Sequence, residues 1–338
     1  DYLADRLVEL GDSVPTNLDS SKITQSNPLN DKALFDFHNY PSDLFAEAGT
    51  KAPNRVGFSK VASWLNSYSR KNHGRPLFVA MSADLAGSTN ISGFSKGRDG
   101  LDDLGMYDKH TNPNSPLMPQ GITEFANAGM MAGLSTVNFN EDTLEDYNGF
   151  IGSFSTYGSF SYLKYGAIRL FSQLAQDSQM KVGKLLWVAG HSGPETAEDS
   201  RTHFGIFAPG VTQLFPKGHI INLHPWEHND VAPALAAALS TDVPIVALHL
   251  TRPAINIPNR EELGIASHFD ASKGAYLIRD YDERPHDGVV IVRGTSSTNT
   301  VVSILDEISS KYNVKIVSAI SWELFDRQSE EYKSSVMN

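Results

Sequence analysis

The stretch RPLFVAMSADL, residues 75–85, contains an apolar run that is followed by Ser, Ala, Asp and Leu. Consecutive apolar residues are typical of a strand buried on both faces, as in a parallel sheet. Four further runs of this kind are NGFIGSF (148–154), KLLWVAG (184–190), GHIINLH (218–224) and VPIVALHL (243–250). Helical patterns separate them at 122–134, 158–176 and 227–240. Strands that alternate with helices predict an α/β fold, a parallel sheet covered on both faces.

The two ends of the chain differ from this pattern. Residues 11–50 are rich in Ser, Asn, Asp and Pro without a sustained period, and we expect residues 1–50 to be a linker over the surface. Near Lys273 a shorter unit begins, with a strand–helix–strand pattern over 288–297, 298–312 and 314–321. One such unit cannot bury both faces of its sheet. We therefore expect 273–338 to be a partial domain of a truncated or partner-dependent chain.

Composition excludes several classes of protein. The 338 residues include 28 basic and 39 acidic side chains, a net charge of −11, without the basic stripe of a nucleic-acid binder. The absence of Cys excludes disulfides, thiolate metal sites and a Cys nucleophile. No apolar run approaches the roughly 18 residues of a membrane span, and the first ten residues do not resemble a signal peptide. We expect a soluble, cytoplasmic protein.

The loop GHSGPETAEDSRTHFG, residues 190–205, follows a buried strand. It therefore lies at the carboxyl edge of the predicted sheet, where α/β proteins bind ligands. Its His191, Asp199 and His203 can point two imidazoles and a carboxylate into one cleft. A solvated polar loop is the alternative that the residues leave open.

Glu124 opens a helix of otherwise apolar and small residues, GITEFANAGMMAGLS (121–135). A helix that is apolar all round is expected to be buried, which places this carboxyl group at the edge of a dry environment. Such a group can hold a proton or share one with a ligand nitrogen. The alternative is a first-turn Glu that satisfies the helix amides.

A metal site is not predicted from the residues. His219, His224, Glu227 and His228 lie close in sequence, but their spacing matches no common zinc pattern. We interpret them as polar residues at the ends of strands and helices.

Five segments, in this order, resemble the transketolase family of thiamine-diphosphate enzymes over about residues 50–338. They are MSADLAGSTN (81–90), GITEFANAG (121–129), HSGPETAEDSRTH (191–203), ALHLTRP (247–253) and SWELFDRQSEEYKSSV (321–336). The resemblance implies a pyrimidine-binding central domain over 51–272 and a partial C-terminal α/β domain over 273–338. It also implies transfer of a two-carbon ketol (glycolaldehyde) unit from a ketose phosphate to an aldose phosphate, with thiamine diphosphate and Mg²⁺ as cofactors.

The resemblance assigns roles residue by residue. Glu124 would bond the pyrimidine ring nitrogen, and His203 would contact the carbonyl end of the donor; both are implied to be catalytic. The implied cofactor contacts are Asp84, Tyr157, Phe160 and Leu163, together with Glu124. The implied substrate contacts are Asp199 on a hydroxyl group and Arg55, Ser88, His191 and Arg252 on the sugar phosphate.

The family's Gly-Asp-Gly and Asn signature for diphosphate and Mg²⁺ is missing from this sequence, and GDS (11–13) does not replace it. The resemblance therefore implies an N-terminal diphosphate-binding domain or subunit as a partner, in a homodimer or larger assembly, with residues 1–50 as the linker from that domain. Thr123 and Phe125 stand where the family has Arg and His, so the resemblance leaves substrate preference open.

Two other functions remain open. One is another ketol-transfer enzyme, such as a dihydroxyacetone synthase or phosphoketolase, or a 2-oxoacid dehydrogenase. The four implied phosphate contacts favour sugar phosphates over 2-oxoacids. The other is a non-catalytic assembly module that uses the cofactor cleft as a partner surface.

Overall fold

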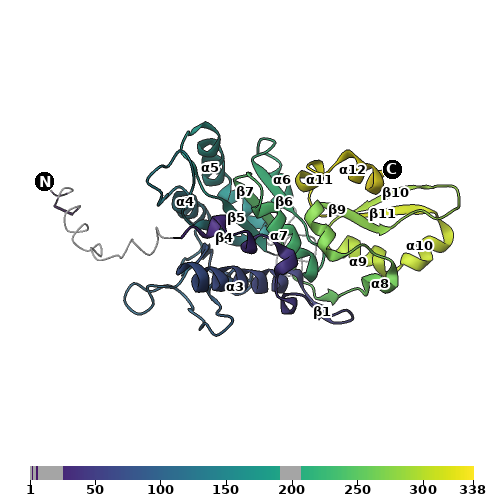
Figure 1. Cartoon of the computed structure of the whole chain (residues 1–338), viewed down its shortest axis with the longest axis horizontal. Coiled ribbons are helices and arrows are strands. Elements are labelled where there is room, and N and C mark those ends of the chain that lie inside the picture. The colour runs from purple at the N-terminus through teal and green to yellow at the C-terminus, as the bar shows by residue number, and fades with distance from the viewer. Residues whose placement is uncertain (1, 3–4, 7–25, 191–206) are drawn as a thin grey trace.

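A six-stranded sheet forms the centre of the molecule in the computed structural model, which describes residues 2, 5–6, 26–190 and 207–338 (Figure 1). The strand order is β3-β2-β4-β5-β7-β6. Every neighbouring pair in this sheet is parallel. The strands are β2 (Phe78–Ser82), β3 (Leu117–Met118), β4 (Ile151–Tyr157), β5 (Leu185–Gly190), β6 (Ile220–Leu223) and β7 (Ile245–His249).

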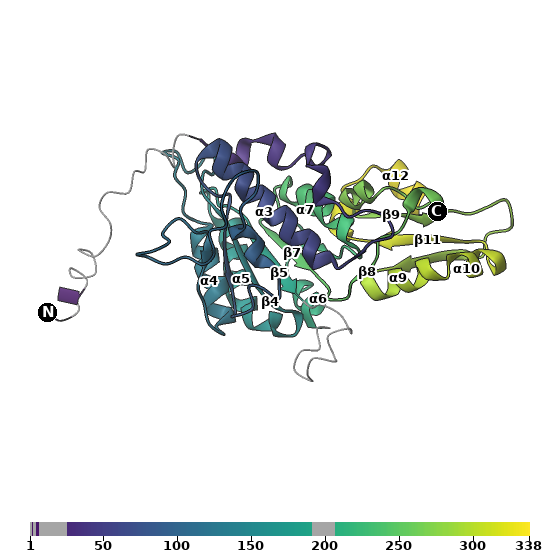
Figure 2. The same ribbon diagram turned by 90° about the horizontal axis from the view of Figure 1, so that it is seen from below.

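Helices cover both faces of this sheet, as the consecutive apolar runs predict (Figures 1 and 2). On one face α3 (Asn54–His73) and α7 (Val231–Leu239) pack onto alternate strand residues such as Leu186 and Val188. On the other face α4 (Glu124–Leu134) and α5 (Tyr165–Asp177) pack onto the intervening residues, among them Trp187. The predicted α/β class with a doubly covered parallel sheet is therefore confirmed.

Two of the predicted helices begin with a 3-10 turn. The stretch predicted as a helix over 158–176 divides into the 3-10 helix η6 (Gly158–Lys164) followed by α5. The stretch 227–240 divides into η9 (His228–Asp230) and α7. A short helix, α6 (Phe207–Thr212), precedes β6.

The C-terminal unit lies beside the central sheet, coloured green to yellow in Figure 1. It contains a three-stranded sheet of order β10-β11-β9, in which β10 pairs parallel and β9 antiparallel with β11. The sequence predicts two of these strands and misses β9. The elements are β9 (Ala275–Arg279), β10 (Gly288–Val292), α9 (Thr295–Ser303), α10 (Leu305–Lys311), β11 (Val314–Ala319), α11 (Trp322–Asp326) and α12 (Glu330–Met337).

A buried ionic cluster joins the two units. Arg260, in α8 (Arg260–Leu263), lies 2.7 Å from Glu227 and 2.8 Å from Asp230, and both acids are fully buried. Tyr276 of β9 donates its hydroxyl hydrogen to Asp230 and accepts a 2.6 Å bond from Trp226 Nε1. Glu227 thus lies at a helix start, as predicted, because it caps η9, and it is buried in the core.

Residues 26–50 run over the surface in four 3-10 turns, with Leu34, Tyr40 and Leu44 buried beneath them. These turns are η1 (Pro28–Asn30), η2 (Lys32–Leu34), η3 (Phe37–Asn39) and η4 (Ser42–Leu44). The described part of the predicted linker therefore packs onto the central domain. A two-stranded antiparallel ribbon of β1 (Lys51–Ala52) and β8 (Ile255–Asn256) follows it.

Candidate functional site

The carboxyl ends of the central strands bring several of the predicted site residues to one edge. Asp84 follows β2, Tyr157 ends β4, and Arg252 follows β7. Asp84 has a φ of 60°, a left-handed conformation that is uncommon outside Gly and is enriched at functional sites. Asp84 and Arg252 are both exposed at this edge.

Glu124 is the first residue of α4, and its side chain is buried at 6% exposure. Thr156, one residue before the end of β4, donates a 3.0 Å hydrogen bond from its hydroxyl to Glu124 Oε1. A carboxylate in a dry setting needs such a donor, because burial without one is costly. The structure thus shows the burial that we expected for Glu124.

The reasoning that led to this expectation is wrong for the rest of the helix. Only Glu124, Asn127, Ala128, Met131 and Ala132 of α4 are buried. The opposite side of α4 is exposed, including Phe125 at 59%. Monomeric proteins rarely expose large apolar patches, which makes this exposed side of α4 an unusual surface.

Ser88 connects two further predicted residues. Its backbone carbonyl accepts a 2.8 Å hydrogen bond from Arg55 Nη1, which extends from α3. Its hydroxyl accepts a 3.2 Å bond from the Tyr157 hydroxyl at the end of β4. Arg55 lies 33 residues from Ser88 in the sequence and Tyr157 lies 69 residues from it, and both bond to this serine. Arg55 therefore reaches the region of Ser88 and Tyr157.

The remaining predicted residues are less closely grouped. Phe160 is half-buried in η6, and Leu163 is 40% exposed on the same helix. His191, Asp199 and His203 lie outside the described residues, so the fold neither joins them to the site nor separates them from it.

Lys164 is a residue that sequence reasoning missed. It ends η6, is completely buried, and its Nζ has no hydrogen-bond partner within the described part of the chain. Its Nζ lies 4.7 Å from the centre of the Phe154 ring. Burial lowers the pKa of Lys164 well below its usual value, and the charge of Glu124 opposes this shift. In the sequence, the feature that could have pointed to Lys164 is its position at the end of the stretch GSFSYLK, which contains two aromatic residues.

In the described ranges no three His, Asp or Glu side chains gather as a metal site. The His and Glu residues near 219–228 have separate partners. His228 Nε2 donates to the carbonyl of Leu44 at 3.0 Å, and His219 Nδ1 lies 3.0 Å from the Ser172 hydroxyl. His224 stacks on His249 with ring centres 4.2 Å apart.

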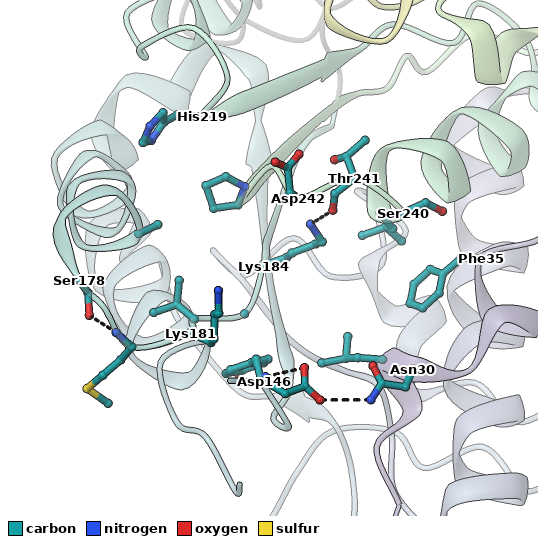
Figure 3. A pocket seen from close by; sticks show the side chains of 18 of the residues that line it. Asn30, Phe35, Asp146, Ser178, Lys181, Lys184, His219, Ser240, Thr241 and Asp242 are labelled. Carbon is teal, nitrogen blue, oxygen red and sulfur yellow. Dashed lines mark hydrogen bonds between the residues drawn. The ribbon is translucent and has the colours of Figure 1, made fainter. Parts of the chain in front are cut away.

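A large cavity lined by described residues lies at the opposite edge of the sheet. It has a volume of about 1010 Å³ and is lined by residues that precede strands, such as Lys184, His219 and Pro244 (Figure 3). Lys184 donates to the backbone carbonyl of Thr241, as Figure 3 shows, and to that of Val243 at 2.9 Å. None of the predicted site residues that the structure describes lines this cavity.

Among the described residues, no helix is long and apolar enough to cross a bilayer. The expected cytoplasmic location stays a prediction.

Comparison with known proteins places this geometry in context. Residues 274–338 match a family model described as the transketolase-like TK C-terminal domain. The chain is 31% identical to Transketolase 1 of Candida albicans over 274 residues, covering 78% of this chain and 35% of that protein. It is 27% identical to a Staphylococcus aureus transketolase over 267 residues, covering 78% and 35%. The chain thus spans about a third of the length of these curated relatives.

Solved structures show the same fold. Transketolase from Leishmania mexicana superposes with a TM-score of 0.65 at 20% identity, covering 90% of this chain and 40% of that chain. A structure titled "Split gene transketolase, inactive beta4 tetramer" matches with a TM-score of 0.54 at 17% identity, covering 85% of this chain and 78% of that chain. At sequence identities this low, the superpositions show a shared fold and do not assign a function.

Proposed function

The chain belongs to the transketolase family, and on that premise we propose that it supplies the pyrimidine half of a thiamine-diphosphate site for ketol transfer. The two-carbon unit would pass from a ketose phosphate to an aldose phosphate. The observation that carries this proposal is the buried carboxyl group of Glu124, held by Thr156 at the carboxyl edge of the sheet.

The residues present fit an aminopyrimidine ring. Glu124 offers a buried carboxyl group, the chemistry that a ring nitrogen needs for a shared proton. Asn127, one turn further along α4, is fully buried, and its Nδ2 has no hydrogen-bond partner among the described residues. An orphaned buried donor beside a buried carboxyl group favours a ligand with acceptor atoms. Tyr157 and Phe160 offer aromatic faces at the same edge.

Thiamine diphosphate, when bound, supplies the carbon nucleophile and the electron sink of the reaction. In our proposal this chain orients the ring. Glu124 holds the proton at the ring nitrogen, Tyr157, Phe160 and Leu163 pack on the ring, and Asp84 contacts the cofactor.

The substrate contacts are a second part of the proposal. Arg55, Ser88, His191 and Arg252 would bind the sugar phosphate, because guanidinium, hydroxyl and imidazole groups suit a dianion. Asp199 would bind a substrate hydroxyl group and His203 the carbonyl end of the donor. The bond between Arg55 and the Ser88 carbonyl supports their common placement.

A partner would complete the site. Five exposed apolar side chains define what we call the α4–α5 apolar face: Ile122, Phe125, Met130, Leu163 and Leu170. The two helices adjoin at Phe125, because a Cβ on Gly166 of α5 would lie 3.1 Å from the Phe125 ring. We propose that this face packs against a diphosphate-binding domain or subunit, which would hold most of the Mg²⁺ coordination, in a homodimer or larger assembly.

Reconstitution tests the proposed function. The chain is mixed with a separately produced diphosphate-binding domain, thiamine diphosphate and Mg²⁺, and ketol transfer between sugar phosphates is assayed. The wild type should be active, and Glu124→Gln should lower the rate by about 10²–10⁴-fold, the usual contribution of a positioned proton-transfer group. Glu141→Gln, on an exposed loop, is the matched control.

A specific pair of results would overturn the proposal. If the complex forms without ketol transfer and Glu124→Gln binds the cofactor like the wild type, the chain is a non-catalytic assembly module.

A further inference from the structure

A second cavity lies between the central sheet and the C-terminal unit. Its volume is about 370 Å³, which is within the range of small-molecule pockets. It is lined by residues of strand β6 and helix α11, which pack against each other (Figure 1). None of the site residues proposed above that the structure describes lies in its wall. The proposed function therefore does not explain this cavity.

Three polar residues of the cavity follow the carboxyl ends of strands in two different sheets. His224 directly follows β6 of the central sheet, and Arg293 directly follows β10 of the C-terminal sheet. Ser321 lies two residues beyond β11, which is parallel to β10. Open α/β sheets bind ligands outside the carboxyl ends of their strands. The cavity thus lies where two such sheet edges meet.

Arg293 supplies a cation that no described residue pairs with. Its side chain is exposed, and its guanidinium group makes no hydrogen bond or ion pair within the described ranges. Glu323 is the acidic residue of the cavity lining, and its carboxylate is engaged elsewhere. Asn222 Nδ2 donates to its Oε1 at 2.8 Å, and the Asn222 backbone N–H and the Ser321 hydroxyl donate to its Oε2 at 3.2 Å. The N–H donors of Arg293 therefore remain available to a ligand.

His224 is a second group with free hydrogen-bonding capacity. Its ring, which stacks on that of His249 with an angle of 6° between the planes, makes no hydrogen bond to a described residue. His249 is 3% exposed, and its Nδ1 has no partner in the described part of the chain. Burial lowers the pKa of His224, and the neighbouring His249 and Arg293 add to this shift. The His224 imidazole is therefore neutral at pH 7 and can donate a hydrogen bond into the cavity.

Apolar side chains complete the lining, among them Ile291, Trp322, Phe325 and Met337. Trp322 is 66% exposed and Ile291 is 57% exposed, which is unusual for side chains of this size. A pocket that combines apolar walls with a few polar groups suits an organic molecule that has one charged end.

We propose that this cavity binds a small organic monocarboxylate, with its carboxylate on Arg293 and His224 and its apolar body against Trp322. A guanidinium group pairs with a carboxylate through two parallel hydrogen bonds. The negative charge of Glu323 in the same lining disfavours a dianion such as a phosphate ester. The inference goes beyond the proposed function, since the two sites share no described residue.

Tryptophan fluorescence of the 338-residue chain tests this site without a cofactor. Of the four Trp residues, Trp64, Trp187 and Trp226 are at most 4% exposed, so quenching by acrylamide reports mainly on Trp322. We expect benzoate to protect Trp322 from quenching, with a dissociation constant of about 1 mM or below. Calorimetry measures the same affinity independently. Benzamide, which lacks the charge, and phenyl phosphate, which carries two charges, should each bind about tenfold more weakly.

A matched pair of substitutions assigns the binding to Arg293. Arg293→Met should weaken benzoate binding by about tenfold or more, because it removes charge-assisted hydrogen bonds. Its circular dichroism spectrum should be unchanged, since the side chain is exposed. Arg284→Met, at an exposed arginine outside the cavity, should bind benzoate like the wild type.

Three results would each refute the carboxylate site. They are an absence of benzoate binding, an equal affinity for benzamide or phenyl phosphate, and an affinity for benzoate that Arg293→Met leaves unchanged.

Discussion

Thr156 Oγ1 lies 3.0 Å from Glu124 Oε1, and this hydrogen bond ties the end of strand β4 to the first residue of helix α4. The two residues are 32 positions apart in the sequence. Because strand β4 is rigid within the sheet, the bond holds the carboxyl group in one position. This relationship explains how an acidic side chain stays buried at the edge of the site.

Replacing Thr156 by Val should therefore loosen Glu124. The substitution removes a hydrogen bond to a buried carboxylate, which is worth about 1.5–3 kcal/mol. We expect a loss of stability of that size in chemical denaturation and weaker thiamine-diphosphate binding by the reconstituted complex. Thr300→Val, at an exposed position of α9, is the matched control. Equal stability of the two variants would show that the bond contributes nothing to the site.

Arg260→Met should be among the most destabilising substitutions. It leaves the fully buried carboxyl groups of Glu227 and Asp230 without their cation. Removing one partner of a buried ion pair costs about 3–5 kcal/mol. Arg284→Met breaks a 2.6 Å ion pair with Asp282 that is exposed, so its expected cost is below about 1 kcal/mol. Urea unfolding of both variants checks the contrast, and similar midpoints would refute it.

Acid should destabilise the fold through the stacked histidines. Burial lowers the pKa of His249 to about 3 and also lowers that of His224. An unfolded His takes up a proton near pH 6.5, whereas the folded His249 does so only near 3. The unfolded state therefore binds more protons in this window, and stability falls as the pH falls, by about 1.4 kcal/mol per unit for each such group.

His249→Gln should reduce this slope, and His110→Gln, an exposed residue, should not. The free energy of unfolding measured from pH 7 to pH 4 decides between these outcomes. A slope that is unchanged in His249→Gln would mean that His249 is protonated in the folded state.

Phe125→Asp should weaken assembly without unfolding the chain. Phe125 is 59% exposed on the α4–α5 apolar face, and a charge introduced into an apolar interface is costly to bury. We expect at least a tenfold weaker association with the diphosphate-binding partner by analytical ultracentrifugation, with an unchanged circular dichroism spectrum. Met106→Asp, 52% exposed on the loop before β3, is the control. Association that survives Phe125→Asp would place the interface elsewhere.

All five central strands that the sequence predicts are present in the fold, but one of them is shifted along the chain. The run 148–154 suggested a strand that β4 occupies only from Ile151 onward, continuing to Tyr157. The predicted strand stops at Phe154, before the polar residues Ser155 and Thr156 of β4. In the fold, Ser155 donates to the Ser82 hydroxyl at 2.9 Å and lies 2.7 Å from the Thr89 hydroxyl. Hydroxyl groups that bond to one another across strands can be buried at little cost, and periodicity does not reveal them.

Strand β9 was missed for a related reason. AYLIR, residues 275–279, is short, and its pairing partner β11 lies some 40 residues further on. Its register is set by contacts with β11 and by the burial of Tyr276 against Trp226 of the central domain. Such contacts arise only when distant segments meet.

Local order along the chain was enough to establish the α/β class, the family resemblance and the candidate residues Glu124, Ser88 and Tyr157. Apolar runs and short motifs are formed by residues that are neighbours in the sequence, so they can be recognised without the fold. The folded molecule added the bond from Thr156 to Glu124, the exposed side of α4, and the burial of Lys164 without a partner. Burial and hydrogen bonding belong to pairs of residues that are far apart in the sequence, so they exist only once the sheet has brought those residues together.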